Sequence, residues 1–179
     1  MPATLEQPQQ PRPAVGAAIN RELYEAIAAS AAKAMDMCGM KVRATGMSCV
    51  PTASTGVVTG MIGVHGKVTG FATVNMAERF ALAAVGGLLG EQYDRLASQV
   101  IDGAGEITNI IVGGIKSIVA GSKWQFSHIT VPTVIVGQNF TIAYSRGLEY
   151  LTASFEHEDP DSIRLEDRMM HISLSLLTL

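Results

Sequence analysis

Glu106 and Asn109 are polar residues in an otherwise apolar stretch, residues 101–121, that has the length and spacing of a helix. Because residues three apart are neighbours on one helix face, the two side chains would project side by side. The carboxylate accepts hydrogen bonds, whereas the carboxamide donates and accepts them without carrying charge. The stretch predicts an amphipathic helix that presents a Glu–Asn pair outward, although the solvated face of an ordinary helix would show the same spacing.

The predicted polar face extends beyond this pair in both directions. Asp102 lies one turn before Glu106, and Lys116 lies two turns after Asn109. The opposite side carries four isoleucines that we expect to face a sheet: Ile107, Ile111, Ile115 and Ile118. This spacing is typical of a helix that is packed on one side and exposed on the other.

Four glycines lie inside the same stretch: Gly103, Gly105, Gly113 and Gly114. Each glycine in a helix costs about 0.5–1 kcal/mol relative to alanine, so the four together cost roughly 2–4 kcal/mol. Tight packing of the helix against a sheet would compensate for this cost. Gly113 has a second explanation, because it lies one turn beyond Asn109 on the same face and would let another macromolecule approach the helix backbone closely.

The rest of the chain predicts the elements that must hold this helix. Alanine-rich residues 17–37 favour a first long helix that Gly39 ends as a left-handed cap, and residues 77–89 favour a shorter helix. Alternating segments predict strands, two of them joined in a tight hairpin at His65-Gly66. The expected strands are residues 41–50, 56–64, 67–76, 126–137, 139–145, 148–157 and 168–179. The fold class is therefore α+β.

A short internal repeat relates the two long helices. The triplet Val-Pro-Thr occurs at residues 50–52 and again at residues 131–133, an offset of 132 − 51 = 81. The same offset relates three further pairs: Gly66 and Gly147, Glu25 and Glu106, and Ala28 and Asn109. We therefore expect two similar α-β halves, with both long helices packed on a shared sheet.

Length and composition fit one folded domain. The chain has 179 residues, of which 47% are hydrophobic and 16% charged, enough for one sizeable core. Residues 1–16 hold four of the seven prolines and almost nothing to bury. They are expected to form a disordered tail ahead of a domain spanning residues 17–179.

The charge of the chain argues against some classes of binding partner, and its cysteine content indicates the cellular compartment. A net charge of −3 and a pI near 5.8 provide no basic surface for nucleic acid or an anionic membrane. The two cysteines, Cys38 and Cys49, have no metal-ligand spacing, the sequence has no apolar run of 18 residues, and no signal peptide is expected. A reduced, cytoplasmic setting is expected.

Two common kinds of site are not expected. The four histidines, His65, His128, His157 and His171, are scattered without the short spacing of metal ligands. The segment GAGEITN precedes helical residues but lacks the Lys and Ser/Thr of a nucleotide-binding loop. We therefore expect the chain to bind neither a metal nor a nucleotide.

Several segments together resemble one known family. GEITNIIVGGIKSIVAG and the following ITVPTVIVGQ resemble the Glu-x-x-Asn helix and the Pro-containing strand of the CheC/CheX/FliY family of chemotaxis phosphatases. VTGFATVNMAERFALAAVGGLLG is similar to the strand and helix that precede them. The resemblance runs from about Asn20 to the C-terminus.

This resemblance implies a phosphatase of response regulators. In that family the helix docks on the phosphorylated receiver domain of a CheY-type protein and hydrolyses its aspartyl phosphate. By resemblance Glu106 would bind a receiver lysine, and Asn109 would orient the attacking water. Asp102, Gly113 and Lys116 would complete the partner-binding face. Mg²⁺ is expected in the partner receiver, and no cofactor is expected on this chain.

The repeat indicates one site per chain. CheC-type members carry the pair on both long helices, whereas CheX-type members carry it on one. The first helix here has Glu25 with Ala28, so it lacks the amide. The sequence therefore resembles the single-site CheX type.

The resemblance also implies a homodimer that exchanges or pairs strands. The β-rich residues 139–157 and 168–179 would otherwise present exposed strand edges, although the last strand could instead lie in the middle of its own sheet. Two other functions stay open from the sequence. One is a non-catalytic adaptor that binds a receiver or another partner through the same helix, and the other is a small-molecule sensor.

Overall fold

The computed structural model describes residues 20–51, 55–138, 142 and 147–178. Three α-helices, seven strands and a 3-10 helix form a mixed α+β fold: α1 Arg21–Met37, β1 Val42–Ser48, β2 Val58–Gly66, β3 Val68–Met76, α2 Glu78–Leu89, α3 Ser98–Ile118, β4 Phe126–Ile129, β5 Thr133–Val136, β6 Glu149–His157, η1 Leu165–Arg168 and β7 Met169–Thr178. The predicted tail, residues 1–16, and nearly all of the strand expected at residues 139–145 lie outside the described residues.

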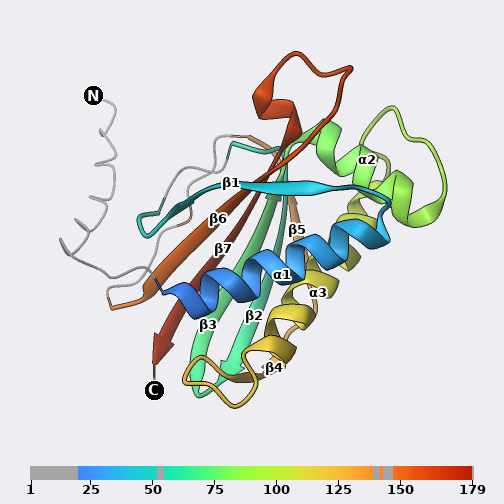
Figure 1. Ribbon diagram of the computed structural model, residues 1–179. Helices are drawn as coiled ribbons and strands as arrows, with labels where there is room; N and C mark the ends of the chain where they lie inside the picture. Colours follow the sequence, from blue (N-terminus) through green and yellow to red (C-terminus); the bar gives the residue numbers. More distant parts are fainter. Residues whose placement is uncertain (1–19, 52–54, 139–141, 143–146, 179) are drawn as a thin grey trace, which may run out of the picture.

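All seven strands belong to one antiparallel sheet. Their order is β1-β6-β7-β3-β2-β4, and β5 also pairs with β2 beyond the end of β4. Helices α1 and α3 lie across one face of this sheet (Figure 1). Helix α1 packs over β1 and β6, whereas α3 packs over β2, β4 and β5. The two long helices therefore share one sheet, as the repeat predicts.

The sheet has the symmetry expected of two similar halves. At one end of the sheet the outer strand β1 is followed by the hairpin of β6 and β7. At the other end the outer strand β4 is followed by the hairpin of β2 and β3, so that β7 and β3 pair at the centre. The offset of 81 residues ends before the hairpins, because β6 begins 149 − 58 = 91 residues after β2. The proposed match of Gly66 with Gly147 is therefore wrong: Gly66 ends β2 within a hairpin, and Gly147 precedes β6.

The predicted cap of the first helix is confirmed. Gly39 has φ +67°, and its N–H donates to the carbonyl of Asp36 while the N–H of Met40 donates to that of Met35. These two bonds form a Schellman motif, which satisfies carbonyl groups at the helix end. At the other end Asn20 Oδ1 accepts a hydrogen bond from the N–H of Leu23.

The two C-terminal strands are interior strands, so the expectation that they present exposed edges is wrong, and the alternative that the last strand lies in the middle of its own sheet is confirmed. Strand β7 lies between β3 and β6, and β6 lies between β1 and β7. Their apolar residues, such as Ile172 and Leu174, face the core, and the hydroxyls of Thr152 and Ser173 bond to each other on the opposite face. Among the described strands, the free edges belong to β1 and to β4 with β5.

No helix in the described part of the chain is both long enough and apolar enough to span a membrane.

Candidate functional site

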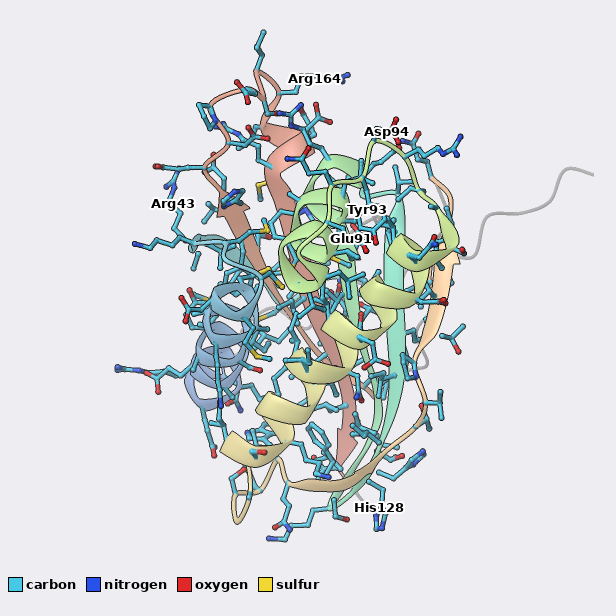
Figure 2. The ribbon with its side chains drawn as sticks, turned by 90° about the vertical axis from the view of Figure 1, so that its right-hand side faces the viewer. Arg43, Glu91, Tyr93, Asp94, His128 and Arg164 are labelled. Carbon is cyan, nitrogen blue, oxygen red and sulfur yellow. The ribbon has the colours of Figure 1, made fainter. Side chains whose placement is uncertain are left out.

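The polar stripe predicted from the sequence lies on the outer side of α3. This helix runs across the front of the molecule in Figure 2, with no other element covering its outer side. Asp102 and Glu106 are exposed, and the other three positions are partly exposed. Steps of four, three, four and three residues keep all five on one helix face: Asp102, Glu106, Asn109, Gly113 and Lys116.

The inner side of α3 explains why this helix is firmly held. Ile107, Ile111 and Ile115 are fully buried, as expected from their spacing. Ile118 is 50% exposed, so its predicted position against the sheet is wrong. The helix ends at Ile118, and the neighbouring Val119 is buried instead.

The helix glycines are used in two ways. A Cβ at Gly103 would lie 2.5 Å from Val85 of α2, and one at Gly114 would lie 2.1 Å from the Ser30 hydroxyl of α1. These two glycines permit tight packing against helices rather than against the sheet. Gly105 is the one that meets the sheet, where Val134 would be 3.4 Å from its Cβ. Gly113 has open space around it, with nothing within 4 Å.

Thr108 anchors the helix directly behind Asn109. Its hydroxyl is buried and donates a 2.7 Å hydrogen bond to the carbonyl of Ala104 in the preceding turn. The side chain fills the space that Gly60 of β2 leaves, because a Cβ there would lie 1.9 Å from the Thr108 Oγ1. This contact sets the distance between α3 and the sheet next to the Glu–Asn pair.

The two long helices differ in the electrostatics of their glutamates. On α1, Arg21 Nε lies 2.7 Å from Glu25 Oε1 in an i,i+4 ion pair. The offset of 81 residues places Asp102 at the position of Arg21 and Asn109 at that of Ala28. Across the described residues, the side chains of Glu106 and Asn109 have neither a hydrogen bond nor an ion pair. The pair on α3 is therefore free to bind a partner, whereas Glu25 on α1 is already paired and has no amide beside it.

Two segments beside the stripe were not predicted as part of a site. The connection between α2 and α3 carries Glu91, Tyr93 and Asp94, which lie above α3 in Figure 2. The hydrogen bond that Tyr93 donates to Glu91, at 2.5 Å, raises the pKa of the tyrosine hydroxyl. The second segment is the link between β4 and β5, where Val131 is 85% exposed next to Pro132. The triplet Val-Pro-Thr at residues 131–133 marks this link in the sequence, in the repeat and in the Pro-containing strand of the family resemblance, but neither predicts an exposed Val131.

The described residues contain no group of three or more His, Cys, Asp or Glu side chains that could hold a metal ion. On α3 itself, Glu106 and Asn109 can form hydrogen bonds, and Glu106 can pair with a positive charge. Such groups bind and orient, and they suit a reaction whose other components come from a partner.

Comparison with protein families finds one match. The family described as chemotaxis phosphatase CheX matches residues 58–156, which include α2, α3 and most of the sheet. No curated protein matches the chain significantly.

Solved structures match over nearly the whole chain. Chemotaxis protein CheX from Vibrio vulnificus is 25% identical with a TM-score of 0.73, covering 87% of this chain and 99% of that one. A putative chemotaxis protein from Desulfovibrio vulgaris Hildenborough is 21% identical with a TM-score of 0.75, covering 88% of this chain and 97% of that one. The CheX-CheY-BeF3-Mg²⁺ complex from Borrelia burgdorferi matches at 22% identity and a TM-score of 0.68, covering 87% of this chain and 97% of that one.

Proposed function

The chain belongs to the chemotaxis phosphatase CheX family, and on this premise we propose that it hydrolyses the aspartyl phosphate of a CheY-type receiver domain. The observation that carries the proposal is the unpaired Glu106 and Asn109 on the exposed face of α3. The structural match to a CheX-CheY complex supports a partner of this kind. A partner of this kind also supports the expected cytoplasmic location.

The reaction needs little from this chain beyond positioning. Water attacks phosphorus in line, the new P–O bond forms as the bond to the aspartyl oxygen breaks, and the products are inorganic phosphate and the free carboxylate. An acyl phosphate is already activated, and Mg²⁺ in the receiver offsets charge on the phosphoryl oxygens. Holding one water in line is worth a factor of about 10² to 10³, or about 3–4 kcal/mol.

Asn109 is proposed to hold that water. Its carboxamide can accept a hydrogen bond from the water and donate one to a phosphoryl oxygen without adding negative charge. A carboxylate at the same position would repel the phosphate. The buried Thr108 behind it keeps the helix backbone at a constant distance from the sheet, so that the amide is presented from a rigid element.

Glu106 is proposed to bind a lysine of the receiver. Its carboxylate is exposed and has no basic side chain of its own helix beside it, because Asp102 lies one turn before it. Asp102 and Lys116 extend the contact along the stripe. Gly113 lets the receiver approach the backbone, since no atom lies within 4 Å of the space where its Cβ would be.

One receiver is proposed to bind per chain. The equivalent surface on α1 has Ala28 in place of the amide, and Arg21 already pairs with its glutamate. Both differences remove the proposed chemistry from α1.

We also propose a homodimer formed through strand contacts, as the family resemblance implies. Because β6 and β7 are interior, the dimer is proposed at the free edge of β1, at the opposite end of the sheet from β4 and β5. The outer face of α3 would stay free in each subunit. A light-scattering mass near that of one 18.9 kDa chain at micromolar concentrations would contradict the dimer.

The test of the function is turnover. Each receiver domain of the same genome is phosphorylated, and a substoichiometric amount of the protein is added while phosphate release is followed. Many phosphates released per protein molecule would establish the phosphatase. Stoichiometric binding with an unchanged phosphate lifetime would instead establish the rival function, a non-catalytic adaptor.

A further inference from the structure

The link between β4 and β5 contains a β-bulge at Val131. On one side of it, Thr130 pairs with Gly63 of β2, and on the other Thr133 pairs with Met61. On β2, one residue, Ile62, separates Met61 from Gly63. On the opposite strand, two residues, Val131 and Pro132, separate Thr130 from Thr133. Two residues opposite one define a bulge, a feature that re-aims a side chain and is common next to active sites.

Both neighbours of Val131 are firmly held. The N–H of Thr130 donates to the Gly63 carbonyl at 2.9 Å, and its hydroxyl accepts a 2.9 Å hydrogen bond from the Gly63 N–H. Pro132 packs beneath α3, where its Cγ lies 3.7 Å from the position of a Cβ at Gly105. Val131 is therefore an apolar side chain on a rigid backbone, and it is 85% exposed.

Pro132, the neighbour of Val131, places this link beside the part of α3 that carries the Glu–Asn pair. Pro132 lies beside Gly105, which directly precedes Glu106 on α3. The stripe on α3 consists of charged and polar side chains and one glycine, and it offers a partner no large apolar group. Interfaces of specific complexes usually combine polar contacts with an apolar centre.

We propose that Val131 is an apolar docking contact for the phosphorylated receiver, continuous with the stripe on α3. This inference rests on the proposed function, and it adds a residue that determines affinity rather than chemistry. The bulge holds the side chain in its exposed position before binding, so little conformational entropy is lost when the receiver covers it. Val131 has no polar atom to offer the reaction, so its loss should leave the chemical step unchanged.

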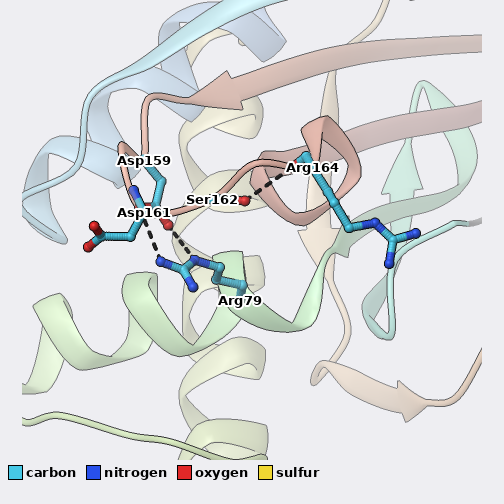
Figure 3. Close-up of polar contacts among 5 residues, drawn as sticks. All are labelled: Arg79, Asp159, Asp161, Ser162 and Arg164. Carbon is cyan, nitrogen blue, oxygen red and sulfur yellow. Dashed lines mark hydrogen bonds and ion pairs between the residues drawn. The ribbon is translucent and has the colours of Figure 1, made fainter.

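A second exposed apolar side chain provides a matched control. Ile163 is 99% exposed and lies on the connection between β6 and β7. Figure 3 shows this connection beside the start of α2, where Arg79 pairs with Asp159 through hydrogen bonds of 2.5 and 3.2 Å. Ile163 is thus at least as exposed as Val131 but belongs to a different connection, between β6 and β7 rather than between β4 and β5.

The experiment compares Val131→Thr with Ile163→Thr. Threonine keeps the branched shape and the strand preference of valine but replaces a methyl group by a hydroxyl. For each variant, Kd is measured for the receiver activated with beryllium fluoride and Mg²⁺, and kcat is measured on the phosphorylated receiver. We expect Val131→Thr to weaken binding about fivefold, from the loss of one buried methyl contact, and Val131→Asp to weaken it more than tenfold. The kcat values and the Ile163→Thr affinity should stay within twofold of wild type.

The outcomes separate the two proposals. If the wild type hydrolyses the phosphorylated receiver and both Val131 variants bind it as tightly as the wild type, the docking contact is wrong and the function stands. A lower kcat with unchanged Kd in Val131→Thr would also overturn the docking role. If the wild type neither binds nor dephosphorylates any receiver, the proposed function fails and this inference fails with it. Thermal unfolding of each variant confirms that it is folded.

Discussion

The hydroxyl of Ser30 on α1 donates a 2.6 Å hydrogen bond to the main-chain carbonyl of Ile111 on α3, 81 residues further along the chain. The same offset, 132 − 51 = 81, relates the two Val-Pro-Thr triplets. Equivalent residues of two similar halves meet each other only near the axis that relates the halves. The two long helices therefore cross at this contact, and Gly114 lies against the same serine.

This crossing predicts a strong steric coupling between Gly114 and Ser30. In Gly114→Ala, the new methyl would lie 2.1 Å from the Ser30 Oγ. We expect the variant to lose about 1–3 kcal/mol of unfolding free energy from overpacking, despite the better helix propensity of alanine. In the double variant with Ser30→Ala the Oγ is absent, and the nearest atom would be the Cβ of residue 30 at 3.1 Å. Part of the lost unfolding free energy should therefore be recovered. Urea unfolding of the single and double variants measures this coupling, expected at about 0.5–2 kcal/mol.

Gly113→Ala is the control for that prediction. Nothing lies within 4 Å of its added methyl, so it should raise the unfolding free energy by up to about 1 kcal/mol. Additive effects of Gly114→Ala and Ser30→Ala would contradict the proposed crossing contact.

Removal of the Asn109 amide should affect turnover far more than binding. The amide acts mainly in the transition state, so Asn109→Ala should lower kcat by about 10² to 10³ and leave receiver Kd within about tenfold. Single-turnover phosphate release and binding to the beryllium fluoride form of the receiver measure the two effects separately. Wild-type turnover by this variant would show that the assigned mechanism is wrong.

Asp102→Arg should reproduce on α3 the ion pair seen on α1. An arginine four residues before Glu106 would pair with it as Arg21 pairs with Glu25 at 2.7 Å. The carboxylate would then be less available to a receiver lysine, and we expect Kd to rise about two- to fivefold with little change in kcat. Glu106→Ala should weaken binding further and lower turnover as well.

The matched controls for this prediction lie on α1. Arg21→Asp and Glu25→Ala should leave receiver binding and turnover unchanged, since the structure gives this surface no amide. If Asp102→Ala and Asp102→Arg weaken binding equally, the whole loss comes from the contact that Asp102 itself makes, and the proposed pairing of the new arginine with Glu106 is wrong.

His171 should make stability depend on pH. Burial lowers the pKa of this histidine, whose Nδ1 lies 2.9 Å from the Ser154 hydroxyl. The folded state therefore binds the proton less readily than the unfolded chain, in which the pKa is about 6.5. Stability is complete above that value and falls as the pH drops through it, by at most about 1.4 kcal/mol per pH unit. Urea unfolding between pH 7.5 and 5 should show this loss in the wild type and a smaller one in His171→Gln. If the unfolding free energy falls with pH equally in the wild type and in His171→Gln, His171 does not contribute to the pH dependence.

Local features of the fold follow from the sequence because they depend on residues close together in the chain. The period of α3 places Glu106 and Asn109 on one face whatever the helix packs against, and Gly39 ends α1 because glycine adopts a positive φ without cost. The β2–β3 hairpin depends on neighbouring segments. The repeat also preserved enough local sequence to align the two helices.

Features that depend on pairing between distant segments could not be predicted from the sequence and required the tertiary structure. Sequence alternation shows that β6 and β7 are strands, but only the pairing of β7 with β3 shows that they are interior. The glycines of α3 have a helical cost that is visible in the sequence, whereas their neighbours, Val85 and Ser30, come from other helices.

The candidate site also has one part that the sequence predicts and one part that needs the tertiary structure. The Glu–Asn pair can be predicted from one helix, because its geometry depends only on a spacing of three residues along one backbone. The exposed Val131 cannot, because a bulge exists only when a strand is aligned with its partner, and Ile62 of β2 lies about 70 residues earlier in the chain. Side-chain direction in a sheet depends on this register, which the free energy of the whole core sets and no local pattern determines.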